Sequence, residues 1–204
     1  MMIICRDICN VIFKYLSFKS KHKIMKTCRE YCSLKITDLY STDKKILLKL
    51  NDKILKNYQY VIELDANNNN NITDVNHMIH LKKLNASQCG ITDRGISMNN
   101  LEILHASNNE QITKIRHMTK LRELYILNIS GITKDELLHV KKLKILDMSY
   151  NYKFNLHSSE LLKDMSHLKT LFIINNSYEQ INIGGTIIDK QYGEWLDLWY
   201  GISK

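Results

Sequence analysis

The residues most capable of chemistry are two cysteine pairs near the start of the chain. Cys5 and Cys9, like Cys28 and Cys32, are spaced so that one helical turn would place each pair of thiols on one face. Two such thiols can ligate zinc, but structural zinc sites mostly use Cys-x-x-Cys knuckles in loops. The odd total of five cysteines disfavours a disulfide framework. We therefore expect no metal site and a reducing compartment, the cytoplasm or nucleus.

The histidines do not combine with a nucleophile. His77, His117 and His139 each precede a recurring Leu by four residues, which marks them as parts of a repeated scaffold. Ser and Cys residues do not stand in an elbow or a Gly-rich turn, and Gly184-Gly185 lacks the rest of a phosphate-binding loop. The sequence therefore predicts a protein that is not an enzyme and uses no cofactor.

A recurring segment of about 20 residues dominates the chain from residue 61 onward. Its first position, at intervals of 20, 20, 20, 22 and 25 residues, is held by Val61, Leu81, Leu101, Leu121, Leu143 and Leu168, each followed three residues later by Leu. This period and leucine pattern are typical of a leucine-rich-repeat solenoid, in which stacked repeats bury a common core. The predicted fold is therefore an α/β repeat with about six repeats over residues 61–180.

Three further columns of the repeat are expected to point into that core. One column lies two residues after the second Leu: Ala66, Ala86, Ala106, Ile126, Met148 and Ile173. Another begins a recurring Ile-Thr pair: Ile72, Ile91, Ile112 and Ile132, with Phe154 in the fifth repeat. The third precedes the leading Leu by three residues: Met78, Met98, Met118, Val140 and Met165.

Position nine of the repeat favours side chains that bond backbone groups in the turn after the strand. Its residues are Asn69, Cys89, Asn109, Ile129, Asn151 and Asn176. Ile129 breaks the pattern, and Asn128 beside it is the expected substitute. The run from Asn67 to Asn71 is interpreted as a bias of composition, because the chain is rich in Lys, Ile and Asn and has no Pro.

Positions three, five and seven of each strand alternate away from the core and predict a partner-binding concave face. The expected contacts with a protein substrate are Asp65, Asn85, His105, Glu123, Tyr125, Leu127, Asp147, Phe172 and Ile174. The apolar members, together with Ile145, predict a patch toward the C-terminal end. Alternatively, residues 181–204, which are predicted to cap the solenoid, fold over Phe172 and Ile174.

The first forty residues predict two short helices, and residues 41–60 a connecting helix or N-terminal cap. The formal excess of eight positive charges lies within residues 1–60, because residues 61–204 carry equal numbers of acidic and basic residues. Such a basic block can steer an acidic partner. Nucleic acid is disfavoured because the basic residues are scattered with few aromatics, and the apolar runs are too short to span a membrane.

Within those forty residues two segments resemble an F-box: Ile4-Cys-Arg-Asp-Ile8-Cys-Asn-Val-Ile12-Phe13-Lys-Tyr-Leu16 and Thr27-Cys28-Arg29-Glu-Tyr31. The family pattern is Leu-Pro-x-Glu-Ile/Leu, then Ile-Phe-x-x-Leu, then Val-Cys-Arg/Lys-x-Trp. The chain departs from that pattern at Cys5, Lys21 and Tyr31, where Pro, an apolar residue and Trp are usual.

The resemblance implies the substrate-recognition subunit of an SCF-type cullin–RING ubiquitin ligase. Its F-box would dock a Skp-type adaptor and thereby a cullin complex, while the repeats would hold an unknown protein substrate. The implied adaptor contacts are Ile4, Ile8, Ile12, Phe13, Leu16, Cys28, Arg29 and Tyr31. The alternative is a leucine-rich-repeat interaction scaffold without ligase association, in which these residues only pack the two helices on each other and on the repeats.

Overall fold

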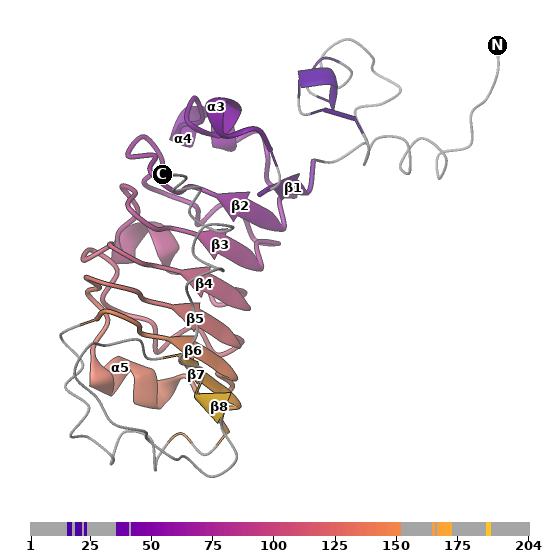
Figure 1. Ribbon diagram of the computed structural model, residues 1–204. Helices are drawn as coiled ribbons and strands as arrows, with labels where there is room; N and C mark the ends of the chain where they lie inside the picture. Colours follow the sequence, from indigo (N-terminus) through magenta and orange to yellow (C-terminus); the bar gives the residue numbers. More distant parts are fainter. Residues whose placement is uncertain are drawn as a thin grey trace, which may run out of the picture.

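The computed structural model describes residues 16–17, 19–21, 23, 36–40, 42–151, 165, 167–172 and 187–188. Its main element is one parallel sheet of eight short strands that pair in sequence order (Figure 1). The strands are β1 (Asp38–Leu39), β2 (Glu63–Asp65), β3 (Lys83–Asn85), β4 (Ile103–His105), β5 (Glu123–Tyr125), β6 (Ile145–Asp147), β7 (Thr170–Phe172) and β8 (Ile187–Ile188). Parallel neighbours need a full crossover between them, so each repeat makes one coil of a solenoid.

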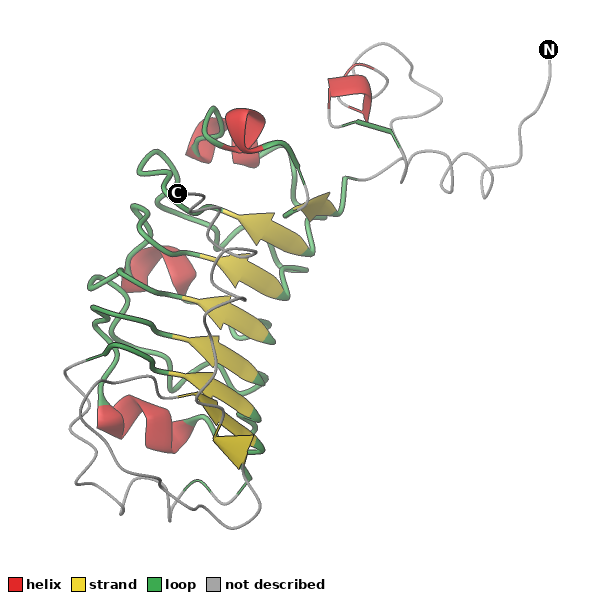
Figure 2. Ribbon diagram, viewed as in Figure 1, coloured by secondary structure: helices red, strands yellow, loops and turns green. Residues whose placement is uncertain are grey.

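The connections carry short helices. These are α3 (Lys44–Leu47) and α4 (Asp52–Leu55) before β2, the 3-10 helix η2 (Asp93–Ile96) before β4, and α5 (Lys134–His139) before β6. Figure 2 shows η2 and α5 on the side of the coil opposite the strands, the convex side. Asp43 and Asn51 cap α3 and α4 by accepting backbone N–H groups of the first turn. Among the described residues, no helix combines the length and apolarity needed to cross a bilayer.

The second Leu of each repeat forms the central column of the core. The strand register pairs Leu39, Leu64, Leu84, Leu104, Leu124, Leu146 and Leu171 in succession, and all are fully buried. The six predicted strands are confirmed as β2 to β7. The sheet is longer than that prediction, because β1 precedes residue 61 and β8 follows residue 180.

The other predicted core columns are also buried where the structure describes them. Ala66, Ala86, Ala106, Ile126 and Met148 line the inner side of the strand exits, and Ile72, Ile91, Ile112 and Ile132 line the return of the coil. Met78, Met118, Val140 and Met165 complete the core, while Met98 is half-buried against it. Phe154 and Ile173 lie outside the described residues. Periodicity alone therefore identified most of the core. It did not select the buried residues before β2, such as Leu39 and Leu55, or Ile96, Ile115 and Leu137 in the later repeats.

Buried Asn side chains bond backbone groups of the turns at three repeats, after β2, β4 and β6. Asn109 Nδ2 donates to the carbonyls of Ala86 at 2.9 Å and Ile91 at 3.1 Å, and its Oδ1 accepts from Gln111 N at 3.0 Å. Asn69 bonds Leu47 and Leu50 in the same way, which ties α3 to the first repeat. Asn151 donates to the carbonyl of Ile126. The predicted role of position nine is confirmed at these three residues, and Asn176 lies outside the described range.

One expectation about asparagines was wrong. In the repeat that lacks Asn, Ser130 rather than Asn128 takes the buried place, and its Oγ accepts from Ile132 N at 3.2 Å. Ile129 is pushed outward and is 50% exposed. Two members of the run Asn67–Asn71 have structural roles. Asn68 occupies the left-handed region at φ 59°, which Asn tolerates better than most residues, and Asn69 makes the buried bonds.

Three carboxylates, the carboxylate clamps Asp52, Asp93 and Glu136, join neighbouring repeats on the convex side. Asp93 accepts from the backbone N–H groups of Thr113 at 2.7 Å and Lys114 at 3.0 Å, and from the Thr113 hydroxyl. Asp52 accepts the same three bonds two repeats earlier, from Thr73 and Asp74. The Thr of the recurring Ile-Thr pair is therefore a partner of the clamp. Glu136 instead reaches back to the backbone of Ile115 and Arg116.

The clamps predict acid lability. Burial raises the pKa of Asp93, but the bonds from Thr113 and Lys114 outweigh it and leave the pKa lowered, as happens at Asp52 and Glu136. A carboxylate with a lowered folded-state pKa stabilises the fold above its unfolded pKa, near 3.8 for Asp, and that stability is lost as the pH falls through the folded value. We expect Asp93→Asn to unfold several degrees below wild type at pH 7, and the gap to close below about pH 4.

The matched control is Asp147→Asn, at a residue where burial raises the pKa. Its ionised form is disfavoured in the fold, so this variant is expected to be at least as stable as wild type at pH 7 and to converge with it in acid. Thermal unfolding followed by circular dichroism from pH 7 to pH 3 measures both. An Asp93→Asn deficit that persists unchanged in acid would contradict the clamp account.

Candidate functional site

The concave face carries one continuous column of position-five side chains. The residue after each central Leu projects from the sheet on the face away from the core, and the parallel register aligns these residues from strand to strand. Six of the nine predicted partner contacts fall in this column: Asp65, Asn85, His105, Tyr125, Asp147 and Phe172. Glu123 lies beside it at position three of β5. The structure therefore brings these seven residues together.

An aromatic pair forms the centre of the column. The rings of His105 and Tyr125 stack at 4.2 Å between centroids and 4° between planes. Tyr40 lies over His105 at 6.4 Å, and Lys83 Nζ lies 3.8 Å from the centre of the Tyr40 ring. Burial, with a smaller contribution from Lys83, lowers the pKa of His105 to about 4, so its ring is neutral at physiological pH. The pair is a fixed, uncharged surface.

Carboxylates surround this aromatic pair. Tyr125 donates its hydroxyl to Glu123 Oε2 at 3.1 Å, which fixes the phenol edge. Burial raises the pKa of Asp147, although the bond from Ser149 opposes it. Burial also raises the pKa of Asp65, against the charges of Lys44 and Lys83. Two carboxylates that cost free energy to ionise in the free protein would gain from a cationic partner.

Several side chains that were predicted to be exposed on the concave face are buried. Leu127 is only 6% exposed, so the expectation that it contributes an exposed apolar contact is wrong. Position seven is mostly buried, since Ser87, Ser107 and Ser149 are buried too. His105 is also buried, at 7% exposure, because Tyr125 and Tyr40 lie against it, and it supports Tyr125 rather than offering a free ring. Ile145 and Phe172 are half-buried, and Ile174 lies outside the described residues.

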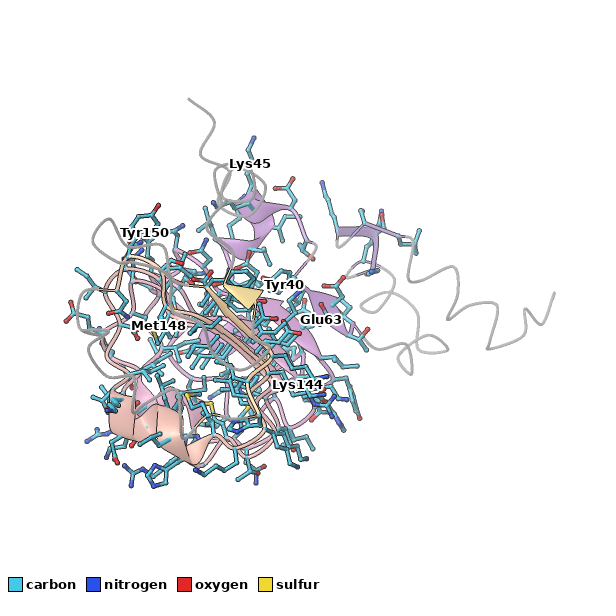
Figure 3. All side chains as sticks on the ribbon, turned by 60° about the horizontal axis from the view of Figure 1, so that its bottom comes forward. Tyr40, Lys45, Glu63, Lys144, Met148 and Tyr150 are labelled. Carbon is cyan, nitrogen blue, oxygen red and sulfur yellow. The ribbon has the colours of Figure 1, made fainter. Side chains whose placement is uncertain are left out.

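The sequence analysis did not select Tyr40 or Lys83. In Figure 3 Tyr40 lies beside Glu63 on one side of the stack of strands. Tyr40 follows β1, whose Leu39 pairs with Leu64, so it starts the position-five column. A signal was present: Leu39 precedes Leu64 by 25 residues, the same interval that separates Leu146 from Leu171.

The predicted adaptor contacts fall almost entirely outside the described residues. Ile4, Ile8, Ile12, Phe13, Cys28, Arg29 and Tyr31 are not described, and neither are the two cysteine pairs. Leu16 is described: it is half-buried and packs against the hydrophobic core. That contact matches the packing role which the scaffold alternative gives it.

The described residues were compared with the geometry of a metal centre. No group of three His, Cys, Asp or Glu side chains within them is placed to hold a metal ion. Cys89 is buried, and burial raises the pKa of its thiol to about 11, so it is a neutral packing group. The described part of the concave face presents a rigid aromatic surface bordered by carboxylates, which suits binding to another molecule.

Solved structures that are similar to this chain were found, and two of them are described here. No family description and no curated protein matches the sequence. Internalin C2 from Listeria monocytogenes is 20% identical, covers 60% of this chain and 58% of its own, and has a TM-score of 0.45. An internalin F from the same organism is 20% identical over 70% of this chain and 58% of its own, with a TM-score of 0.39.

The match therefore spans less than two thirds of either internalin chain, and similarity at this level carries no argument about function. The fold assignment depends on features of this chain itself: a parallel sheet in sequence order, one Leu column and an Asn at the turn of most repeats. By its fold, the chain is a leucine-rich-repeat solenoid.

Proposed function

We propose that this protein is a non-catalytic leucine-rich-repeat scaffold that binds a protein partner on its concave face. The observation that carries the proposal is the Tyr125 ring, which is held by the His105 stack and by its bond to Glu123 on the open side of the sheet. A Tyr fixed in this way loses little conformational entropy on binding, which is typical of residues that dominate interfaces.

The charges beside Tyr125 favour a basic or aromatic partner side chain. Glu63, Asp65, Glu123 and Asp147 project on or beside the column, whereas Lys83 pairs with Glu63 and the charge of Lys44 acts on Asp65. An Arg of the partner would stack on the phenol ring and pair with a carboxylate at the same time. The partner is therefore expected to insert an Arg, Lys or aromatic residue near β5 and β6.

Affinity purification tests this proposal. The concave variant Tyr125→Ala/Asp147→Lys is compared with Arg94→Ala, which removes an exposed side chain from η2 on the convex side. A partner that is recovered with wild type and with Arg94→Ala but lost with the concave variant supports the proposal. Equal recovery of the partner with all three proteins would mean that the partner binds elsewhere, and it would contradict the proposal.

The narrower proposal is that the scaffold is a substrate receptor of a ubiquitin ligase. Its support is the F-box resemblance of residues 4–31, and Phe13 is the residue of the family's most specific element that tests it most cleanly. Leu16 is a poor target because it packs against the core, and truncating it would disturb the solenoid as well.

We expect wild type to bind a purified Skp-type adaptor and Phe13→Ala to weaken that binding at least tenfold, because buried aromatic anchors carry much of an interface's energy. Leu48→Ala, an exposed apolar side chain at the end of α3, is the matched control. Binding is measured by isothermal titration with the full chain. If wild type shows no adaptor binding, the scaffold without ligase association remains.

A further inference from the structure

A second surface lies on the flank of the solenoid, where the chain enters each strand. Five backbone hydrogen bonds of 2.7 to 2.8 Å connect the residues at position two in a single column: Ile62, Lys82, Glu102, Arg122, Lys144 and Lys169. Neighbours in this column are therefore separated by the strand spacing of about 4.8 Å. A parallel column two residues earlier, directly before the first position of each repeat, contains Tyr60, His80, Asn100, Lys120, Lys142 and His167.

These two columns concentrate positive charge. We define the flank stripe as its exposed cations: Lys82, Lys120, Arg122, Lys142, Lys144 and Lys169. Glu102 is the one acidic residue in the two columns, and Lys82 pairs with it at 3.0 Å. The hydrogen bond from Lys82, and the charges of Lys82, Arg122 and Lys120, lower the pKa of Glu102, which shows that these cations surround it. The stripe lies at position two and directly before the first position of each repeat, whereas the concave column lies at position five, so the two surfaces share no residue.

A groove of mixed polarity adjoins the β3 end of the stripe. It has a volume of about 440 Å³, and Tyr60, Ile62, Ile79 and His80 line it together with the polar side chains Lys82, Asn100, Glu102 and Lys120. The Tyr60 and His80 rings stack at 5.8 Å with 16° between planes, which gives the groove one flat wall. Ile79 is 62% exposed, an unusual state for a large aliphatic side chain.

We propose that this flank binds an extended acidic segment of a partner protein, with one apolar side chain in the groove and carboxylates on the flank stripe. From β3 to β7 the stripe spans four strand steps, about 19 Å, which matches about six residues of extended chain at about 3.3 Å each. Charge complementarity selects carboxylates, and the groove selects an aliphatic residue at one end of the segment.

A single-stranded nucleic acid fits this surface less well. Such ligands bind by stacking successive bases on aromatic side chains. Tyr60 and His80 instead stack on each other, and Tyr60 is the only Phe, Tyr or Trp in the two columns. Beyond the groove the flank stripe consists of Lys and Arg side chains, whose charges suit a short peptide rich in carboxylates.

The test measures binding of a fluorescent peptide to the full chain by anisotropy. The peptide is acetyl-Ile-Glu-Glu-Asp-Glu-Asp-Glu-amide, and its comparator has Ser in place of Ile. The stripe variant Arg122→Glu/Lys144→Glu is compared with Lys45→Glu/Lys53→Glu, which makes the same charge change at exposed residues of α3 and α4. A groove variant, Ile79→Ser, and a twelve-nucleotide oligothymidylate complete the set, and equal melting temperatures establish that each variant is folded.

We expect the stripe variant to bind the peptide at least tenfold more weakly than wild type, and the α3/α4 variant to change affinity less than twofold. Ile79→Ser should weaken the Ile peptide about fivefold and leave the Ser peptide unchanged, because only the former loses an apolar contact. Equal losses in both charge variants, no effect of Ile79→Ser, tighter binding of the oligothymidylate, or no peptide binding by wild type would each overturn the proposal.

Discussion

Replacing Asn109 with Ala is expected to lower the free energy of unfolding by about 3 kcal/mol and the melting temperature by roughly 6–12 °C. The amide makes three hydrogen bonds in the buried turn, to Ala86, Ile91 and Gln111. Truncation removes the side-chain partner of the Ile91 carbonyl and of the Gln111 N–H, and it leaves the Ala86 carbonyl only the weak thiol donor of Cys89, in a buried turn. Because the bonds join neighbouring repeats, their loss should also make unfolding less cooperative.

Asn109→Asp separates the two roles of the amide, which donates to two carbonyls and accepts from one N–H group. The carboxylate can still accept from Gln111, but it cannot donate, and it faces two carbonyl oxygens in a buried place. We expect this variant to be at least as unstable as Asn109→Ala at pH 7 and to recover partly in acid. Asn99→Ala, at an exposed residue, should remain within about 0.5 kcal/mol of wild type. Chemical denaturation measures all three, and an Asn109→Ala curve that matches Asn99→Ala would refute the buried-amide account.

Tyr125→Ala is expected to weaken partner binding by about 2 kcal/mol, or roughly thirtyfold, with little change in melting temperature. The ring is half-buried and is held from both sides by His105 and Glu123, so it presents a surface that is ordered before binding. Truncation removes that surface and frees the Glu123 carboxylate at the same time. Surface plasmon resonance with the purified partner measures the loss.

Tyr125→Phe is the matched control for the ring itself. It keeps the stack on His105 and removes only the hydroxyl that bonds Glu123. We expect it to retain most of the affinity, with a loss of about threefold. A loss as large as that of Tyr125→Ala would mean that the hydroxyl, rather than the aromatic surface, carries recognition.

The sequence predicted the solenoid well because its information is periodic. The Leu, Ile and Met columns repeat at fixed offsets, and a buried column leaves few alternatives to an aliphatic residue. Features that break the period were harder to predict. β1 is separated from β2 by the long segment that holds α3 and α4, and Ser130 replaces an Asn by a shift of one residue.

The binding surface could be predicted only in outline. Alternation of side chains along a strand places position five on the concave face, but it does not say how deeply a side chain is covered. Leu127 and His105 are buried by neighbours from other repeats, and Tyr40 reaches the column from a strand outside the recognised period. These are contacts between repeats, and a pattern within one repeat does not contain them.

The distribution of charge over the surface was also not predictable from the sequence. Residues 61–204 have equal numbers of acidic and basic residues in sequence, which suggests an electrically featureless domain. In space the charges are separated, with carboxylates near the concave column and the cations of the flank stripe along one side. A net charge of zero therefore conceals two surfaces of opposite preference.

Site-specific photo-crosslinking tests the concave-face account most directly. Benzoyl-phenylalanine is introduced at Asn85 or Ile145, which lie on either side of Tyr125 along the sheet, and at Arg94 or Lys114, which are exposed on the convex side. The account predicts that the partner is cross-linked from Asn85 and Ile145 and not from the two convex positions. Cross-linking from Arg94 or Lys114 alone would contradict it.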